Sequence, residues 1–589
     1  MGRNTTCFLT LIALLLALQL WAAPPRIVGV PPADAARDLC VTADGEIRHY
    51  GWRHENGSRV RVYCASRDGG ENWTTHLAAT NDAGAMVKSP WSGEWISFAQ
   101  DDTPSRTAWL IRSKRGPGYP ADVRMSTGWA RHELRQLFPL KTRKRWIALF
   151  SDTRCENGEC YHSAVAYSDD DGKTWRRVAI APVPNVARLH PGDRRPHWFN
   201  DGCEPTAVER KDGSLLMIVR TSGEHHAAYE SFDGGETWGV GRELPAFWAA
   251  NTMPYLFRLS DGRILFFWNN TSMLPTRDVA ETPEIHDGER RGVWEVVFTN
   301  RDVLHAAISD DDGKTWKGFR EVALNEVRNA CDFRELGEPG VENDKSVHQT
   351  QAIELKDGKV LLAYGQCSVA RRLAIFDPDW LLETSREEDF RRGLGALSNH
   401  LYVRTLLGGY RGWSGHCAWN RIPGALLVRD PDLDGSPIGR PRSVRDVLQL
   451  CRIRDPRLVS DRQGVVWNFP AAKKGVVTVE CRRAGTGFRL TLADHWFNPC
   501  DEVAPGRSPA SFVVSEKMLP KDRWVTLMVA WDESSREAIL SCDGVELARE
   551  QLKCLPPFGL SYLHLQTLAE ETDSRGVFFR CFRQFTSNL

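Results

Sequence analysis

Glu204 and Arg220 are the residues whose types and spacing most plainly predict chemistry. Glu204 begins one predicted strand and Arg220 ends the next, and the turn-forming pair Asp212-Gly213 lies between the two strands. Strands joined by a hairpin run antiparallel, so we expect both side chains at the same end of one sheet. An arginine there can hold a carboxylate through two parallel hydrogen bonds, because its planar guanidinium stays charged at every working pH.

Because the chain has no net charge, an acidic ligand must be held by a few cations at specific positions. The chain has 76 Lys and Arg residues against 76 Asp and Glu residues, which gives a net charge of zero. Nothing in this balance attracts nucleic acid or an anionic membrane. The 589 residues exceed the size of one ordinary domain, and a hydrophobic content of 42% excludes a disordered chain. We therefore expect at least two folded units.

The N-terminal residues predict a secretory signal peptide over residues 1–23. Arg3 precedes the apolar run 8–20, and Ala22-Ala23 stands just before Pro24-Pro25. The run is shorter than the roughly 20 residues of a membrane-spanning helix. We therefore expect no membrane insertion, a soluble mature chain, and a secreted or periplasmic location.

The cysteine count fits an oxidising compartment. Removal of Cys7 with the signal peptide leaves fourteen of the fifteen cysteines, an even number that permits disulfides, and Cys155 and Cys160 are candidates for a local pair. The alternative is that most of these cysteines are buried thiols, because a domain of this size does not need disulfides. No spacing predicts a metal site, and we expect no cofactor.

Four segments share the pattern S-x-D-x-G-x-T-W, with Asn72 in place of the threonine in the first; they begin at Ser66, Ser168, Ser231 and Ser309. Each follows a predicted strand, so its Asp-Gly portion predicts a hairpin turn in which Asp and Ser bond the backbone and Trp covers the turn. The segments start 102, 63 and 78 residues apart, and the longest interval has room for two units, one of them without the pattern. We expect an array of four-stranded sheets: an all-β, six-bladed β-propeller over residues 24–385.

These repeats are similar to the Asp boxes of sialidases, and residues 24–385 resemble the propeller of the sialidase (neuraminidase) superfamily. Other propellers also carry such boxes, which lie away from the active site, so the function depends on other residues. The resemblance implies an exo-α-sialidase, a glycoside hydrolase that removes terminal sialic acid from sialylated glycans or glycoproteins. In this family three arginines from separate blades hold the carboxylate of the sugar.

Several arginines match positions that bind the sugar carboxylate in this family. Arg220 ends its strand as the family pattern requires, and Arg301 opens the strand that leads into the fourth box. The family's Arg-Ile-Pro sequence in the first blade is missing. Arg37 stands at about the right distance from the next turn, whereas Arg26 lies further upstream. The implied set is Arg37, Arg53, Arg220 and Arg301.

The resemblance makes Glu204 the carboxylate that activates the nucleophile, but the acid of the family is not in its usual place. That acid is an aspartate shortly before the first box, and residues 53–59 contain none. Glu55 or His54 could replace it. A proton supplied by the substrate or by solvent is the other possibility.

The nucleophile of the family is missing as well. It is a tyrosine that precedes the last Asp-Gly turn, but residues 344–358 contain no tyrosine. Counting back from that turn places Gln349, flanked by His348, at the tyrosine position. Glutamine is not a useful nucleophile toward an anomeric carbon, so we expect attack by water, with inversion. Gln349 would orient the water, and Asp344 or Glu204 would accept its proton.

Two other functions stay open at the level of the sequence. Without the tyrosine and the aspartate, the chain could be a non-catalytic propeller that binds an acidic sugar. It could also be a hydrolase or lyase of another uronate-bearing glycan, since arginine and histidine at a propeller centre suit that chemistry as well.

The C-terminal part predicts a second unit. Residues 386–419 are charged and then glycine-rich and are expected to form a linker, and residues 420–589 show short alternating strands without an Asp box. The segment 524–532 and the strand that follows it resemble concanavalin- or laminin-G-like β-sandwiches. Such a unit either binds sugar or packs on the propeller as a structural part. The oligomeric state is not predicted.

Overall fold

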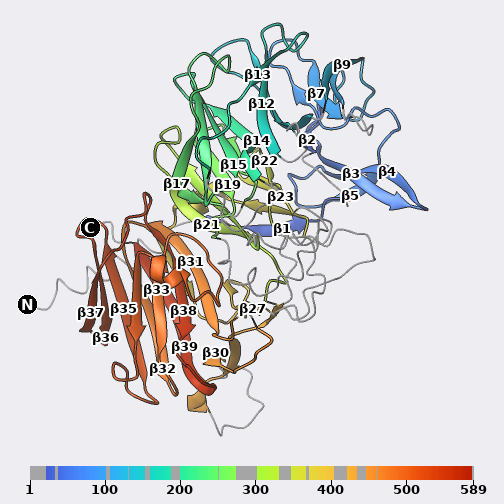
Figure 1. Ribbon diagram of the computed structural model, residues 1–589. Helices are drawn as coiled ribbons and strands as arrows, with labels where there is room; N and C mark the ends of the chain where they lie inside the picture. The colour runs from blue at the N-terminus through green and yellow to red at the C-terminus, as the bar shows by residue number, and fades with distance from the viewer. Residues whose placement is uncertain are drawn as a thin grey trace, which may run out of the picture.

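The computed structural model shows an almost entirely β protein, in which the strands form two bodies (Figure 1). It describes residues 22–32, 38–100, 107–130, 132–152, 160–186, 199–249, 251–272, 301–329, 346–365, 370–402, 421–433, 446–458 and 460–586. Residues 1–21, nearly all of the predicted signal peptide, lie outside these ranges. No helix within them is long and apolar enough to cross a membrane.

The first body is built of antiparallel units of four strands. Its strands are β1 (Arg26–Gly29), β2 (Leu39–Val41), β3 (Ile47–Glu55), β4 (Ser58–Ser66), β5 (Thr74–Leu77), β6 (Val87–Lys88), β7 (Trp95–Gln100), β8 (Thr107–Ser113), β9 (Val123–Ala130), β10 (His132–Pro139), β11 (Trp146–Asp152), β12 (Cys160–Ser168), β13 (Arg176–Ala179), β14 (Phe199–Glu209), β15 (Leu215–Thr221), β16 (His225–Ser231), β17 (Arg242–Trp248), β18 (Tyr255–Arg258), β19 (Ile264–Trp268), β20 (Val303–Ser309), β21 (Lys317–Leu324), β22 (Gln351–Glu354), β23 (Val360–Tyr364) and β24 (Arg372–Phe376). The units are β2–β5, β6–β9, β10–β13, β14–β17, β18–β21, and β22–β24 with β1. The third and fourth join into one sheet through a parallel pairing of β12 with β14.

These units surround a central cavity. The innermost strand of every unit, from β2 through β6, β10, β14 and β18 to β22, contributes to the lining of a cavity of about 1140 Å³. Buried side chains pack neighbouring units together; Leu216 of β15, for example, packs in one cluster with Phe266 of β19. The N-terminal strand β1 pairs with β24 and so completes the last unit. The prediction of an all-β propeller is confirmed.

The Asp boxes form the turns between the third and fourth strands of their units. In the second box, Asp170 Oδ1 accepts from Ser168 Oγ and from the Thr174 backbone N–H, both at 2.8 Å, and Oδ2 accepts from Thr174 Oγ1 at 2.6 Å. Gly172 has φ 75°, and Trp175 Nε1 donates to its carbonyl at 3.1 Å. The unit β6–β9 lies between the first two boxes and carries none, as the interval of 102 residues predicts.

We expect Asp170→Ala to lower the free energy of unfolding at pH 7 by about 1–2 kcal/mol, because it removes the acceptor of several hydrogen bonds. Burial raises the pKa of the Asp170 carboxyl, but hydrogen bonds from Thr174 and Ser168 outweigh it and lower the pKa from 3.8 to about 2. A depressed pKa contributes stability above the unfolded value that is lost as the pH falls toward the folded value. The difference between wild type and variant, measured by urea unfolding, should therefore shrink between pH 4 and pH 2.

Asp310→Ala is the matched control for this prediction. Asp310 also lies in an Asp box, but its side chain is exposed and pairs with the exposed Lys317 at 2.9 Å. Surface pairs of this kind contribute little, so we expect a change below about 0.5 kcal/mol. If Asp170→Ala lowered the free energy of unfolding by the same amount at pH 7 and at pH 2, the ionised Asp170 carboxylate would not be the source of the stability.

The second body is a β-sandwich. Its strands are β25 (Ser385–Glu388), β26 (Leu397–Ser398), β27 (His400–Tyr402), β28 (Arg421–Pro423), β29 (Leu426–Arg429), β30 (Asp446–Arg452), β31 (Gly464–Ala472), β32 (Lys474–Arg483), β33 (Phe488–Ala493), β34 (Ala510–Val514), β35 (Trp524–Asp532), β36 (Glu537–Cys542), β37 (Val545–Gln551), β38 (Leu560–Thr567) and β39 (Asp573–Thr586). One sheet has the order β29-β30-β39-β32-β35-β36-β37, and the other β26-β31-β38-β33-β34, while β27 and β28 form a separate two-stranded sheet. Buried side chains of both sheets, including Trp467 and Phe579, form one core. The predicted sandwich is confirmed.

The short helical elements are η2 (Pro378–Leu382), η3 (Pro431–Leu433) and α4 (Ala504–Arg507). The segment expected as a linker, 386–419, contains strands where it is described. β25 pairs with β39, β26 with β31, and β27 with β28. The Ser-Arg-Glu-Glu sequence of β25 does not predict a strand, because charged side chains are depleted in sheet interiors. They are common, however, on edge strands.

Nine cysteines of the described ranges are present as thiols. They are Cys40, Cys64, Cys203, Cys451, Cys481, Cys500, Cys542, Cys554 and Cys581, and most are buried. For the six buried positions the alternative of buried thiols holds. Cys155 lies outside the described residues, so the Cys155–Cys160 disulfide stays a prediction.

Candidate functional site

Glu204 and Arg220 meet across the hairpin of β14 and β15. The register of the two strands shifts on both sides of Cys203, which lies opposite Arg220. Such irregularities re-aim side chains relative to a regular strand. Arg220 Nη1 donates to Glu204 Oε2 at 2.8 Å, and both residues are buried. The hairpin thus brings Glu204 and Arg220 together, as the sequence predicts.

Arg135, which the sequence analysis did not single out, holds the other oxygen of Glu204. Its Nη2 lies 2.9 Å from Glu204 Oε1, and its Nε donates to Ser151 Oγ at 2.9 Å. The same hydroxyl accepts from the backbone N–H of Glu204 at 3.1 Å. Arg135 occupies a register shift of β10, between Leu134 and Gln136. A bulge of this kind has no sequence signature; the available signal was an arginine on an innermost strand.

Asn251 connects this pair to Arg301. Arg220 Nε donates to Asn251 Oδ1 at 2.8 Å, and Arg301 Nη2 donates to the Asn251 backbone carbonyl, also at 2.8 Å. Asn251 and Arg301 are both buried, the first before β18 and the second before β20. The sequence analysis missed Asn251, because it lies in a connection between units and matches no motif.

His348 is the next partner of Arg301. Arg301 Nη1 lies 2.9 Å from His348 Nε2. Because an arginine N–H can only donate, Nε2 must accept, and the imidazole is therefore neutral in this arrangement. The backbone N–H of Val347 donates to the Arg301 carbonyl at 2.9 Å, which fixes the His348–Gln349 segment beside Arg301. His348 thus holds the guanidinium and does not present a proton on Nε2.

Backbone strain gathers in this network. Glu204, Asn251 and Gln349 have φ values of 47°, 51° and 59°, in the left-handed region. Asparagine tolerates this region, but glutamate and glutamine rarely occupy it. Residues held in such conformations cluster at active sites and ligand clamps, where the surrounding structure maintains them. The strain therefore marks the same positions as the hydrogen bonds.

Other predicted site residues are not part of this network. Arg37 and Asp344 lie outside the described residues. Arg53 and Glu55 form an ion pair with each other near the tip of the β3–β4 hairpin, where both are exposed. Arg26 pairs with Glu71 and is exposed as well. The structure therefore brings together Glu204, Arg220, Arg301 and His348, with Gln349 next to the last.

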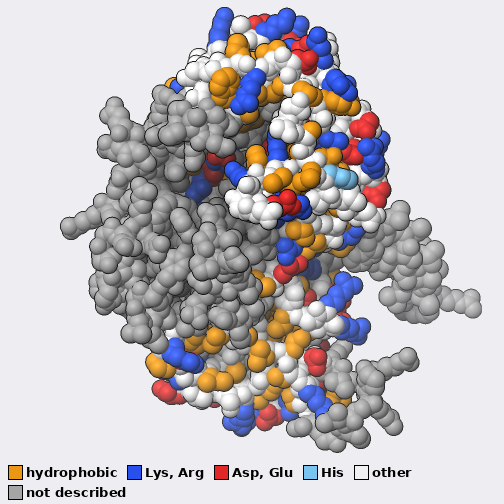
Figure 2. Space-filling view, turned by 90° about the vertical axis from the view of Figure 1, so that its right-hand side faces the viewer, with side chains coloured by type: hydrophobic (Ala, Val, Ile, Leu, Met, Phe, Trp, Pro, Cys, Tyr) orange, Lys and Arg blue, Asp and Glu red, His pale blue; other side chains and the backbone are white. Residues whose placement is uncertain are grey.

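The described part of the network carries excess positive charge. Three guanidinium groups, those of Arg135, Arg220 and Arg301, accompany two carboxylates, the buried Glu204 and the exposed Glu133, which lies 2.9 Å from Arg135 Nη2. Burial lowers the pKa of the neighbouring His226 to about 3, so this histidine stays neutral near pH 7. An excess of buried cations suits an acidic ligand. Over the described surface drawn in Figure 2, by contrast, basic and acidic side chains are interspersed, and some of each lie in a hollow.

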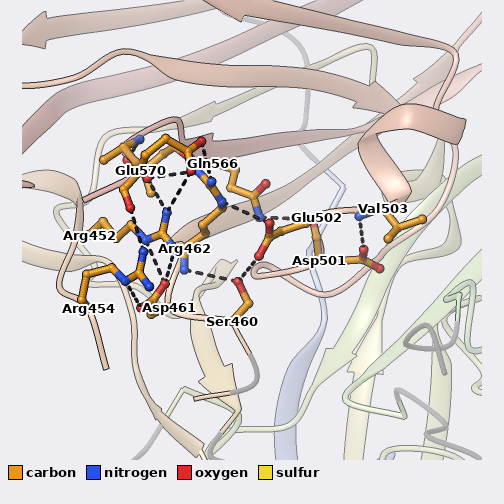
Figure 3. Close-up of polar contacts among 12 residues, drawn as sticks. Arg452, Arg454, Ser460, Asp461, Arg462, Asp501, Glu502, Val503, Gln566 and Glu570 are labelled. Atoms are coloured by element: carbon orange, nitrogen blue, oxygen red, sulfur yellow. Dashed lines mark hydrogen bonds and ion pairs between the residues drawn. The ribbon is translucent and has the colours of Figure 1, made fainter. Parts of the chain in front are cut away.

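A second charged cluster lies in the sandwich, where Arg452, Arg454 and Arg462 lie among acidic side chains (Figure 3). Arg452 Nε donates to Asp461 Oδ1 at 2.8 Å, and Arg462 bridges Glu570 at 2.7 Å and Glu502 at 3.2 Å. Each of these carboxylates has a guanidinium partner, so the cluster ties loops of the sandwich together. In the described ranges no group of three or more His, Cys, Asp or Glu residues is placed to hold a metal ion.

Comparisons with known proteins identify relatives of the propeller. Residues 118–328 match the family model of the BNR repeat-like domain. A sialidase of Paraclostridium sordellii is 26% identical over 185 residues, which are 31% of this chain and 39% of that protein's length. Among solved structures, a protein of unknown function from Dyadobacter fermentans has a TM-score of 0.37 at 15% identity and covers 60% of this chain and 96% of its own. The Trypanosoma rangeli sialidase in complex with 2,3-difluorosialic acid has a TM-score of 0.35 at 14% identity and covers 95% of both chains.

The propeller, its Asp boxes and the two sequence matches point to the same family. The boxes form turns at equivalent places in their units, and the BNR match spans the three units from β10 to β21 in full, together with β9 of the unit before them. The matched relative is a sialidase, of which this chain spans less than half the length. These findings support membership of the sialidase superfamily.

Proposed function

We propose that this protein is an exo-α-sialidase, a glycoside hydrolase that removes terminal sialic acid from glycans or glycoproteins. The observation that carries the proposal is the network in which Arg135 and Arg220 hold Glu204, and Asn251 joins Arg220 to Arg301 of another unit. Sialic acid bears a carboxylate on its anomeric carbon, and paired guanidinium groups recognise a carboxylate by charge and by geometry. The sialidase relative supports the same substrate class.

In this proposal Arg220 and Arg301 bind the sugar carboxylate, and Glu204 acts on the attacking group. Gln349, in the strained segment next to His348, orients a water molecule, and Glu204 or Asp344 accepts the proton of that water. Glu55 is engaged by Arg53 on an exposed hairpin, so we propose that solvent supplies the proton of the leaving group. Direct attack by water inverts the anomeric configuration.

The proposed location of the protein follows from the predicted signal peptide. We propose that residues 1–23 are removed and that the enzyme is secreted or periplasmic, where it meets glycans of the cell surface or of the medium. Nucleic acid is not proposed as a partner, because the chain has no net positive charge.

Proton NMR of α-2,3-sialyllactose treated with the protein tests both the reaction and its stereochemistry. We expect release of free sialic acid, with the β anomer formed first and the α anomer appearing only by mutarotation. The physical reason is that water attacks the face opposite the leaving group. The first spectra must be taken within minutes, before mutarotation mixes the anomers.

Each other outcome of this experiment has a definite meaning. Initial α-sialic acid would overturn direct water attack and indicate a covalent intermediate. Binding of sialyllactose without release would favour the non-catalytic, acidic-sugar-binding propeller. An unsaturated product from a uronate-bearing polysaccharide, together with no release from sialyllactose, would favour a lyase.

A further inference from the structure

A buried ion pair joins the sandwich to the propeller next to the candidate site. Arg421 of β28 donates through Nη1 to Asp302 Oδ1 at 2.9 Å and through Nη2 to Asp302 Oδ2 at 2.7 Å. Both side chains are 0% exposed. The two parallel bonds form the fork-to-fork geometry that fixes the direction of a guanidinium relative to a carboxylate.

Asp302 directly follows Arg301 in the chain, so this ion pair lies one residue away from a proposed substrate clamp. The two side chains serve different partners, since Arg301 contacts His348 and Asn251 whereas Asp302 contacts Arg421. Asp302 Oδ1 also accepts from Asn325 Nδ2 at 3.1 Å. The Asp302 carbonyl accepts from the backbone N–H of Asn325 at 2.7 Å. The position of the Arg301 backbone is thus set on one side by the site and on the other by the sandwich.

A second arginine crosses the same boundary in the opposite direction. Arg328 of the propeller donates from Nη2 to the backbone carbonyls of Gly395 and Leu397, and its own carbonyl accepts from Arg421 Nη1 at 3.1 Å. Burial lowers the pKa of Arg328 from its usual value. Two buried arginines, Arg328 and Arg421, thus meet at this boundary, and Asp302 is the carboxylate that pairs with Arg421. The geometry of the Asp302 side chain therefore depends on the sandwich.

The rest of the boundary has contacts that do not involve Asp302. Val303 packs in one cluster with Trp496 and Tyr562 of the sandwich. The backbone N–H of Trp496 donates to the Asn270 carbonyl at 2.9 Å, and Tyr562 Oη donates to Glu321 Oε1 at 2.8 Å. These contacts keep the two bodies docked whether or not the ion pair is present. A buried ion pair adds little net stability compared with apolar residues of similar volume, so its role here is geometric.

We propose that Arg421 is a positioning residue for Arg301, so that the sandwich is an integral part of the sialidase site and not a separate sugar-binding module. The proposal rests on the proposed function. In it, the Arg421–Asp302 pair fixes the chain at residues 301–302, and this aims the Arg301 guanidinium at the sugar carboxylate. Loss of the ion pair should then mainly weaken substrate binding.

The test is the double variant Asp302→Leu/Arg421→Met, which replaces the ion pair by apolar side chains. Such replacement of a buried pair usually keeps a protein folded, so we expect a thermal midpoint within about 5 °C of wild type. We expect KM for a sialoside to rise about 10-fold with kcat changed less than about twofold, because a small displacement of a binding group weakens its bonds to the substrate. The control is Tyr562→Phe, which removes another polar contact of the same boundary and should leave KM within about twofold of wild type.

The outcomes separate this inference from the proposed function. If the wild-type protein neither hydrolyses nor binds sialosides, the proposed function is wrong and this inference falls with it. If the wild type is active and the folded double variant keeps the wild-type KM, only the inference is overturned. Should the double variant fail to fold, Arg421→Lys replaces it: a raised KM with unchanged kcat supports the inference, and an unchanged KM overturns it.

Discussion

Replacing Glu204 with glutamine is expected to lower kcat for sialoside hydrolysis by about 10³-fold, because the amide cannot accept a proton from the attacking water. The side chain keeps its shape, but its single oxygen can accept from only one of the two arginines, Arg135 and Arg220, which hold the two oxygens of Glu204 at 2.9 and 2.8 Å. KM should stay the same or fall, since Arg220 no longer shares its charge with a carboxylate. A loss confined to kcat is the mark of an interaction made in the transition state.

Glu209→Gln is the control for this prediction. Glu209 lies on the same strand, β14, and is also buried, but it accepts hydrogen bonds from the backbone N–H groups of Lys141 and Thr142, at 2.5 and 3.0 Å. We expect the variant to lose some stability and to keep kcat within about twofold. If Glu204→Gln retains more than a tenth of the wild-type kcat, or if Glu209→Gln loses as much, Glu204 does not act on a proton in the reaction.

The residues found from the sequence are those whose positions are fixed by local patterns. Glu204 and Arg220 flank one Asp-Gly turn, so a single hairpin decides that they meet. Arg301 was located because it opens the strand that leads into the fourth Asp box. In each case the turn chemistry fixes the register, and the register places the side chain.

Arg135 and Asn251 could not be found in this way, because their contacts depend on how separate units are placed around the cavity. Arg135 reaches Glu204 from the preceding unit through a bulge in β10. Asn251 contributes both its side chain and its carbonyl because its backbone is left-handed. Neither the bulge nor the backbone conformation has a pattern in the residues around it.

The expectation for Arg53 and Glu55 overlooked a local signal. The pair Asn56-Gly57 has φ values of 48° and 76°, and Glu55 pairs directly with Ser58. This is the tight two-residue hairpin that Asn-Gly favours. It extends β3 and β4 to nine residues each and leaves Arg53 and Glu55 near an exposed tip.

The sequence predicted that the second unit is a sandwich, but it did not predict the contact of this unit beside the candidate site. Arg421 follows a long stretch without strand patterning, and nothing in the residues around it indicates a partner more than a hundred positions earlier. The burial of both charges shows that the contact belongs to the folded core. Contacts of this kind depend on how the two bodies dock, which hydrophobic periodicity does not encode.

Arg301→Lys is expected to raise the dissociation constant for N-acetylneuraminic acid by about 100-fold, as measured by calorimetry. A lysine has a single ammonium group and cannot form the two parallel bonds of a guanidinium to a carboxylate. It also cannot bond both His348 and the Asn251 carbonyl, which Arg301 contacts at 2.9 and 2.8 Å. The loss of one or two charge-assisted hydrogen bonds, each contributing about 1.5–3 kcal/mol, accounts for a change of this size.

The methyl ester of the same sugar shows whether the lost affinity belongs to the carboxylate. The ester has no charge for Arg301 to pair with, so wild type and Arg301→Lys should bind it equally weakly. Arg145→Lys serves as the protein control, because Arg145 is also buried and forks onto Asp169 at 2.6 and 2.9 Å, but at an Asp box. It should lose stability and keep its affinity for the acid. An equal loss of affinity for acid and ester in Arg301→Lys would mean that Arg301 supports the fold of the site without binding the carboxylate.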